Sequence, residues 1–284
     1  MRTHEDKLRT ENLPTEETRG KLYFWMKEVI DITRPKIFIA ENVKGLVNMG
    51  QVKDIIQRDF AHASGNGYIV LSPQVLHAGN YGVPESRERV IFIGIRKDAL
   101  KTEIAQALEG EHVPANLYPY PKPTHNCTLN DSTLHPPVVL RDVLERLKEP
   151  EESLDPSQRF YSKAKYMGTH CQGQKEIAMD SIGPTIRSEH HGNIEFRRLS
   201  LELKGKYKDE LMRGLMGRRL TPRECALIQT FPPDYQFVIP KDYNWKRFIV
   251  SASGAYKVIG NAVPPILAYH IAMRIQNLWP TYFK

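Results

Sequence analysis

Residues 36–43 read KIFIAENV, and the apolar run at 36–40 is typical of a strand buried on both faces of a parallel α/β sheet. A helix is predicted before it, because apolar residues recur at steps of three and four from Leu22 to Ile32 until Pro35 ends the pattern. A second helical pattern runs from Val52 to Phe60 and stops at the Ser-Gly-Asn-Gly sequence of residues 64–67. A strand between two amphipathic helices indicates an α/β protein.

Two further strands follow in the sequence. Residues 68–76 have strand character, but Pro73 has no N–H to donate and therefore places this strand at a sheet edge. Residues 82–96 read GVPESRERVIFIGIR, and the part at 89–96 is apolar enough to lie inside. The loop at 77–88 is short enough to join antiparallel neighbours. We therefore predict a doubly wound sheet that an antiparallel hairpin closes at one edge.

The rest of the chain has weaker patterns. A polar helix is predicted near residues 102–109, and residues 115–217 are interpreted as a smaller, irregular domain. Order returns at Thr221, which with Pro222 and Glu224 has the sequence of a helix capping box. The GNAVPP sequence at 260–265 opens a final amphipathic helix. We expect a polar leader at 1–20, a sheet domain at 21–114, the irregular domain at 115–217, and a return to the sheet domain at 218–284.

The composition is that of an ordinary globular protein, with 40% hydrophobic and 26% charged residues among 284. No apolar stretch approaches the roughly 20 residues that a membrane helix needs, so no membrane partner is expected. The first twenty residues contain no secretion signal, which predicts a cytoplasmic protein. The 40 Lys and Arg residues outnumber the 33 Asp and Glu residues, which favours an acidic partner such as nucleic acid.

The chain has three cysteines, at Cys127, Cys171 and Cys225. They are too few and too far apart for a disulfide framework, which indicates a reducing compartment. His125 and His135 lie near the first of them, but the spacing fits no structural zinc site. We therefore predict no metal site.

Three charged residues stand at places where α/β proteins bind ligands. Glu41 directly follows the first predicted strand, at the carboxyl end, and is a candidate acid or base. A solvated loop glutamate is the alternative interpretation. Arg87 and Arg89 are two residues apart at the start of the last strand, so they are predicted to share one face and could clamp an anion or a polar base edge. A surface ion pair is the alternative.

Four segments together resemble the signature motifs of the cytosine-5 DNA methyltransferases. They are ENV at 41–43, GVPESRERV at 82–90, RRLTPRECALIQTFPPDY at 218–235 and YKVIGNAVPP at 256–265. Their order and approximate spacing match the family, including the long variable stretch between the second and the third. The resemblance implies a partial Rossmann-like methyltransferase sheet, consisting of its last three strands with an antiparallel hairpin edge, and a smaller target-recognition domain.

The resemblance also implies a reaction. In this family a cysteine thiolate attacks C6 of a flipped-out cytosine in double-stranded DNA, and C5 then takes a methyl group from S-adenosylmethionine. Glu41 matches the residue that contacts N3 and the exocyclic amine of the base. Arg87 and Arg89 match the pair that positions the base. Glu85 stands where the family usually has Gln, which leaves that contact in doubt.

Further residues are implied to bind the cofactor and the DNA. Gly260, Asn261 and Val263 match the last motif, which forms the methionine end of the S-adenosylmethionine pocket. The segment at 184–198 stands where family members build their DNA-reading loops. Six of its residues could reach phosphates or base edges: Arg187, His190, His191, Asn193, Arg197 and Arg198.

Two family motifs are missing from this sequence: the Pro-Cys-Gln nucleophile and the Gly-rich cofactor loop. Three interpretations follow. The sequence is a truncated or mis-started part of a longer product, it is one subunit of a split methyltransferase of a restriction-modification system whose complementary chain carries both motifs, or it is a noncatalytic DNA-binding module. We favour the first slightly, because the leader resembles an insert between the nucleophile and the first helix. In all three we expect this chain alone to be inactive.

Overall fold

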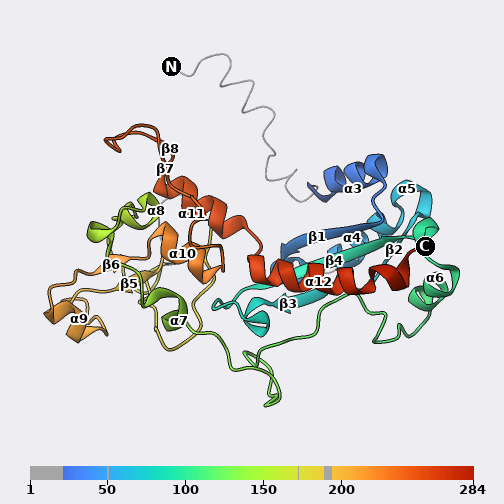
Figure 1. The fold of residues 1–284 in the computed structure, drawn as a ribbon, viewed down its shortest axis with the longest axis horizontal. Helices are drawn as coiled ribbons and strands as arrows, with labels where there is room; N and C mark the ends of the chain where they lie inside the picture. Colours follow the sequence, from blue (N-terminus) through green and yellow to red (C-terminus); the bar gives the residue numbers. More distant parts are fainter. Residues whose placement is uncertain (1–21, 50, 172, 189–193) are drawn as a thin grey trace. The chain divides into compact units, whose positions relative to one another are not determined.

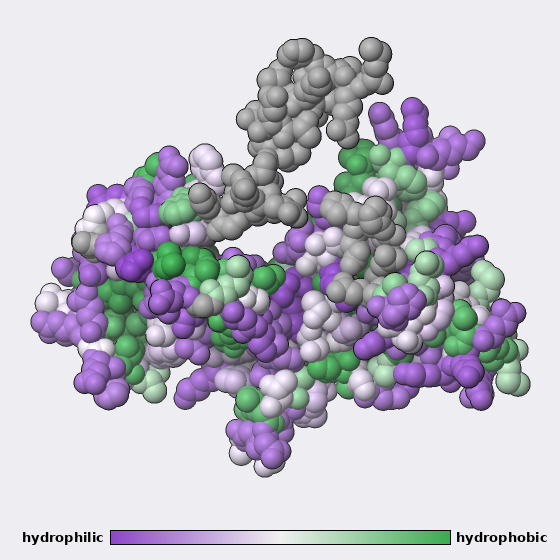
Figure 2. Space-filling model, turned by 180° about the vertical axis from the view of Figure 1, so that it is seen from behind, coloured by the Kyte–Doolittle hydropathy of each residue, from purple (hydrophilic) through white to green (hydrophobic). Residues whose placement is uncertain are grey.

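The computed structural model describes residues 22–49, 51–171, 173–188 and 194–284, which divide into two compact units (Figure 1). The sheet unit holds the described residues up to 75 together with 89–120 and 275–284, and the second unit holds 76–88 and 121–274. No helix in these described ranges combines the length and the apolar character that crossing a membrane requires. In the view of Figure 2, hydrophilic residues cover much of the described surface and hydrophobic residues form smaller patches between them.

The sheet unit is built on four strands. They are β1 (Ile37–Val43), β2 (Tyr68–Val70), β3 (Gln74–His77) and β4 (Glu88–Arg96). β4 is central, because β1 and β2 pair with it antiparallel in the order β1-β4-β2 and β3 pairs with it as well. The α/β class and the antiparallel hairpin are confirmed. The strand predicted at 68–76 is divided at residues 71–73, where Pro73 cannot donate a ladder hydrogen bond.

β1 differs from the prediction in two ways. It continues through Glu41, Asn42 and Val43, all of which pair with β4. Its burial alternates, with Phe38 buried and Ile39 43% exposed, so the prediction of a strand buried on both faces in a parallel pair was wrong. The reason is that its partner in the described sheet is the antiparallel β4, and only one face of β1 is fully covered.

Helices cover one face of this sheet. They are α3 (Leu22–Thr33), α4 (Val52–Ala61) and α5 (Ala63–Asn66), with the 3₁₀ helix η1 (Lys44–Asn48) beside them. Their apolar residues form one core with alternate residues of the strands, and the rings of Phe38, Phe60 and Phe92 pack edge to face. The Phe38 ring lies over its cross-strand partner Gly94, where a Cβ atom would come within 2.0 Å of it. The sheet unit also contains η3 (Lys97–Ala99) and α6 (Thr102–Glu109).

The second unit has short elements around its own apolar core. Its helices are η2 (Ala78–Tyr81), α7 (Leu140–Leu144), η4 (Pro150–Glu152), α8 (Pro156–Arg159), α9 (Lys208–Met212), α10 (Pro222–Ile228) and α11 (Ala252–Asn261). Its strands form two antiparallel pairs, β5 (Phe196–Arg198) with β6 (Arg218–Arg219) and β7 (Ile239–Pro240) with β8 (Phe248–Val250). The predicted final helix is α12 (Pro265–Tyr282), which begins in this unit and ends in the sheet unit.

The start of α10 forms as predicted. Thr221 Oγ1 accepts a hydrogen bond of 3.0 Å from the backbone N–H of Glu224, and Glu224 Oε2 accepts one of 2.8 Å from the backbone N–H of Thr221. This reciprocal capping box satisfies two N–H groups that a helix start otherwise leaves without partners. α11 was not predicted, although Ser251 caps it by accepting a hydrogen bond from Gly254 N.

Candidate functional site

Glu41 and Arg89 form an ion pair on one face of the sheet. Val43 lies opposite Arg89 and Glu41 lies opposite Ile91, so the two charged side chains are diagonal neighbours on the same face. Arg89 Nε is 2.6 Å from Glu41 Oε1, and the side chains are 12% and 26% exposed. The register of β1 and β4 therefore brings the two side chains together. Glu41 is a strand residue and not the solvated loop residue of the alternative interpretation.

The pair has a defined chemical capacity. A carboxylate can accept or release a proton, and a guanidinium can hold a carbonyl or a carboxylate through its planar donors. Both side chains are shielded from water on most of their surface, which strengthens their electrostatic effect on a bound group. A polar heterocycle with an acceptor and a donor on one edge is a suitable partner.

Arg87 has a different environment, and it contacts other residues of the second unit. Its side chain is fully buried and donates hydrogen bonds to the backbone carbonyls of Ile186, Gly260 and Ala262 at 2.8 to 2.9 Å. Glu85 Oε1 lies 3.5 Å from Arg87 Nη1. The structure gives the two arginines different partners, since Arg87 donates to backbone carbonyls and Arg89 pairs with Glu41. Arg87 therefore links its own segment to residue 186 and to the turn at 260–262.

Glu85 shares this buried position. Its Oε1 accepts a hydrogen bond of 2.6 Å from Ile186 N, and its side chain is fully buried. A buried carboxylate beside a buried guanidinium avoids the large cost of an isolated charge. The glutamate that stands here in place of the usual Gln therefore has a countercharge in Arg87.

The turn after α11 contains the predicted cofactor residues. A Cβ atom on Gly260 would lie 2.2 Å from the carbonyl carbon of Arg187, so the bare face of this glycine packs against the backbone of residues 187–188. Asn261 is exposed, and Val263 is partly buried. Gly260 therefore permits a close backbone contact, whereas Asn261 offers its amide group to solvent or to a ligand.

The six predicted DNA-binding residues have different outcomes. His190, His191 and Asn193 lie outside the described residues. Arg187 is 32% exposed at its side chain and is 3.4 Å from Glu195. Arg197 and Arg198 are 8% and 1% exposed and pair with Glu210, and Arg198 also pairs with Glu149.

Glu149 and Glu210 are the two glutamates that bind these arginines, and neither was identified from the sequence. Glu149 accepts hydrogen bonds from Arg198 Nη2 at 2.7 Å and from Arg218 Nε at 2.8 Å. Burial raises the pKa of Glu149, but the hydrogen bonds from the two arginines outweigh this effect and lower the pKa to about 2. Its partners lie 49 and 69 residues away in the chain, so no local pattern could have found them.

The three cysteines have no common environment. Cys225 is fully buried in α10, and burial raises the pKa of its thiol well above the usual value. Burial also raises the pKa of the partly buried Cys127, whereas Cys171 is exposed. In the described part of the chain, no group of three or more His, Cys, Asp and Glu side chains is arranged to hold a metal ion.

Comparison with known proteins adds the family context. Residues 10–277 match the family model described as C-5 cytosine-specific DNA methylase. The type II methyltransferase M.BsuRI of Bacillus subtilis is 33% identical over 95% of this chain, and M.BspRI of Lysinibacillus sphaericus is 33% identical over 95%. This chain spans only 56% and 57% of the length of these two relatives.

Among solved structures, the Dnmt2 methyltransferase of S. pombe has a similar fold. The TM-score is 0.54 at 16% sequence identity, and the match covers 95% of this chain and 75% of that chain. At this identity the likeness concerns the fold alone.

Proposed function

This chain belongs to the C-5 cytosine-specific DNA methylase family, and we propose that it takes part in methyl transfer from S-adenosylmethionine to C5 of a cytosine in double-stranded DNA. The relatives above are type II methyltransferases, so we also propose a role in a restriction-modification system. The observation that carries the proposal is the ion pair of Glu41 and Arg89, which places an acid and a cation on one face of the sheet.

In this proposal, Glu41 and Arg89 act on the flipped-out base. Attack at C6 pushes electron density toward N3 and the carbonyl of the ring, and a proton supplied at N3 relieves that charge. In the pair, Arg89 stabilises the negative form of Glu41. When a cytosine binds, Arg89 moves its hydrogen bond to the base carbonyl, and this exchange allows Glu41 to hold a proton for N3.

The turn after α11 fits one part of a cofactor site. Asn261 is exposed, and its amide would bond the polar methionine end of S-adenosylmethionine, to which the partly buried Val263 would add an apolar contact. The cofactor supplies the methyl group when it is bound. Gly260 contributes by packing on the backbone at 187–188, and Arg87 fixes the turn through the carbonyls of Gly260 and Ala262.

We propose that the attacking thiolate comes from polypeptide outside this sequence. Burial raises the pKa of the buried Cys225 and of the partly buried Cys127, which favours their neutral thiol forms, whereas a thiolate is the reactive species. Cys171 follows His170 and not proline, unlike the family motif. A longer product of the same gene, or a separate complementary chain, would supply the thiolate and the cofactor loop.

The sheet unit has a surface suited to such a polypeptide. α3 exposes large apolar side chains along its length: Leu22, Phe24, Trp25, Val29 and Ile32. β1 pairs only with β4 among the strands of the described sheet, and Ile39 and Val43 on β1 are also exposed. Exposed apolar groups and an unpaired strand edge favour association with further strands and helices.

DNA recognition is proposed for residues 187–193 of the second unit. Arg187 keeps part of its side chain exposed, as contact with a phosphate or a base edge requires. His190, His191 and Asn193 remain candidates from the sequence. Arg198 is assigned to the ion-pair network that supports this unit, in which Arg197 has only a contact of 3.4 Å with Glu210.

The test measures transfer of tritiated methyl groups from S-adenosylmethionine to duplex DNA. We expect no transfer by the purified chain alone, and transfer when the chain is joined to or mixed with the upstream segment of a family relative. Restored activity should fall on the order of 10²-fold in Glu41→Gln, because a general acid is lost. Glu103→Gln, an exposed glutamate on α6, is the matched control and should retain full activity.

Three outcomes of these measurements would contradict the proposals. Transfer by the chain alone would show that a thiol of this sequence attacks the base. Unchanged turnover in Glu41→Gln would remove Glu41 from the reaction. Sequence-selective DNA binding by a chain that no complement activates would instead support a noncatalytic DNA-binding module.

A further inference from the structure

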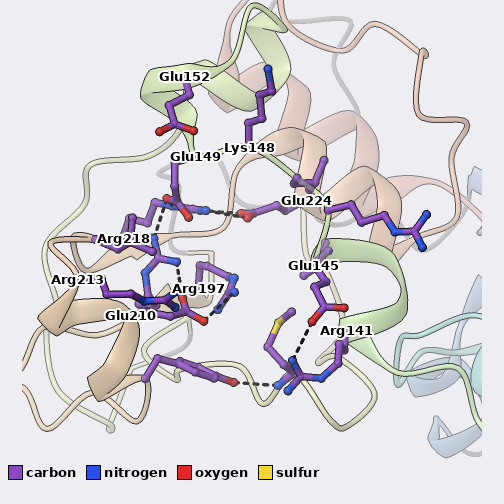
Figure 3. A pocket seen from close by; sticks show the side chains of 17 residues that line it. Arg141, Glu145, Lys148, Glu149, Glu152, Arg197, Glu210, Arg213, Arg218 and Glu224 are labelled. Carbon is purple, nitrogen blue, oxygen red and sulfur yellow. Dashed lines mark hydrogen bonds and ion pairs between the residues drawn. The ribbon is translucent and has the colours of Figure 1, made fainter.

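The second unit contains a pocket of about 600 Å³ that the reaction above does not use. It lies among α7, α9, β5 and β6, and we call it the arginine pocket (Figure 3). Seven Lys and Arg side chains and five Glu side chains line it, so its lining carries an excess of positive charge. A pocket of this kind attracts anions.

Four of the five glutamates in the arginine pocket already bind arginines, and one of these pairs is Glu145 with Arg141 at 3.3 Å. Glu149 holds Arg198 and Arg218, and Glu224 holds both terminal nitrogens of Arg218 at 2.8 and 2.9 Å. Figure 3 shows these contacts as dashed lines. Glu210 Oε2 accepts a hydrogen bond of 2.7 Å from Arg198 Nη1. Glu149, Glu210 and Glu224 therefore make their short hydrogen bonds with Arg198 and Arg218.

Arg197 makes only a long contact with its carboxylate partner. Its Nη2 reaches Glu210 Oε1 only at 3.4 Å, and its Nη1 is buried without a hydrogen-bond partner in the part of the chain that the structure describes. Arg197 is 8% exposed, and its guanidinium lies 5.2 Å from the centroid of the Tyr207 ring. A buried charged donor without an acceptor is costly, so this position is suited to an additional oxyanion.

Exposed cations complete the lining. Lys148 and Arg213 both line the pocket and are exposed, so they add positive charge to the part of the lining that solvent reaches. An arginine presents donors in a plane that matches a phosphate, and lysine adds charge with flexible geometry. Leu144, Leu147 and Met179 add apolar lining, which lowers the local dielectric constant and strengthens the attraction.

We propose that the arginine pocket binds a phosphate group, with Arg197 as its buried anchor and with Lys148 and Arg213 as exposed cations of its lining. Two sources share this chemistry: a phosphodiester of the DNA backbone and a free phosphorylated molecule. Only the first source depends on the proposed function, because a free phosphate needs no methyl transfer and no recognition of DNA.

The first measurement uses inorganic phosphate as the probe. The thermal midpoint of the full chain is followed against phosphate concentration, with chloride at equal ionic strength as reference. We expect phosphate to raise the midpoint of the parent chain and to bind Arg197→Gln about tenfold more weakly or worse, as loss of a charge-assisted contact requires. Arg247→Gln is the matched control: this arginine is 72% exposed, pairs with Asp242 and does not line the pocket.

Arg213→Gln provides the second variant, because an exposed side chain can be changed without loss of folding. It should weaken phosphate binding severalfold, and it tests the proposal even if Arg197→Gln does not fold. No stabilisation of the parent chain by phosphate, or equal binding by both pocket variants and Arg247→Gln, would overturn the proposal.

The second measurement identifies the source of the phosphate. Binding of a labelled duplex is followed by fluorescence anisotropy over a range of salt concentrations. If the phosphate belongs to DNA, Arg197→Gln lowers the affinity and reduces the salt slope by about 0.9, the value for one phosphate contact. If DNA binding is unchanged while inorganic phosphate binding is lost, the pocket serves a free phosphorylated molecule.

Discussion

Replacement of Arg87 by methionine tests the cross-link that this residue makes to residue 186 and to the turn at 260–262. The change keeps an unbranched side chain of similar reach and removes the guanidinium that binds the carbonyls of Ile186, Gly260 and Ala262. A hydrogen bond from a charged donor contributes about 1.5–3 kcal/mol, and these three share one donor group and are not additive. Breaking a buried ion pair on one side costs about 3–5 kcal/mol.

These values agree on a loss of about 4 kcal/mol in the free energy of unfolding for Arg87→Met. This is a large part of the 5–15 kcal/mol that is typical of a folded domain. The comparison is Glu85→Gln, in which the amide oxygen can still accept from Ile186 N and only the charge beside Arg87 is lost. We expect this variant to lose about 1–2 kcal/mol.

The assay is urea denaturation at pH 7, followed by far-ultraviolet circular dichroism, with the slopes compared as well as the midpoints. The two compact units can unfold separately, so hydrogen exchange at residues 186, 260 and 262 identifies where stability is lost. A loss below about 1 kcal/mol in Arg87→Met would refute the cross-link, because an anchoring role requires the larger cost.

Two further predictions concern packing and pH. Gly260→Ala should lower the thermal midpoint by several degrees, because the new methyl group would lie 2.2 Å from the backbone carbon of Arg187, and backbone cannot move aside as a flexible side chain can. Gly254→Ala in the same helix should be neutral or stabilising, since its methyl group meets Val250 Cγ1 at 3.3 Å and alanine favours the helix; equal effects of the two changes would contradict this account. Glu149→Gln should be less stable than the parent chain at pH 7, with a difference that shrinks between pH 4.5 and pH 2. The sign follows from the pKa, which falls from 4.5 to about 2 on folding, so the carboxylate stabilises the fold above pH 4.5 and loses this effect as it is protonated. Denaturation midpoints across this range would show it, and a difference that is constant with pH would contradict it.

Much of the sheet unit could be predicted from local patterns. The alternation and length of apolar runs predicted β4 and the helix α3, and Pro35 correctly marked the helix end. Thr221, Pro222 and Glu224 predicted the start of α10 because a capping box involves residues only three apart. The extent of β1 was missed, since Glu41 and Asn42 are polar and only their pairing with β4 continues the strand.

The helices and strands of the irregular second unit could not all be predicted from local sequence patterns. α11 contains two glycines and was missed, because its formation depends on the burial of Ala255, Tyr256 and Ile259 in the core of this unit. Tyr256 is held at its hydroxyl by Leu220 O at 2.7 Å, a contact between residues 36 apart. Tertiary packing of this kind outweighs the weak helix propensity of glycine.

The arginines show why residue type and spacing do not assign a role. Arg87 and Arg89 are two residues apart, yet one donates to backbone carbonyls about 100 and 175 residues away and the other pairs with a carboxylate on a neighbouring strand. Arg198 finds two glutamates, whereas its neighbour Arg197 keeps a buried donor without a partner in the described chain. A guanidinium satisfies its donors with whatever acceptors the fold brings to it, and those acceptors are set by long-range packing. The functional assignment of an arginine therefore depends on the acceptors that the fold brings to it. Arg87 donates to three backbone carbonyls, whereas Arg197 makes one long hydrogen bond, to Glu210.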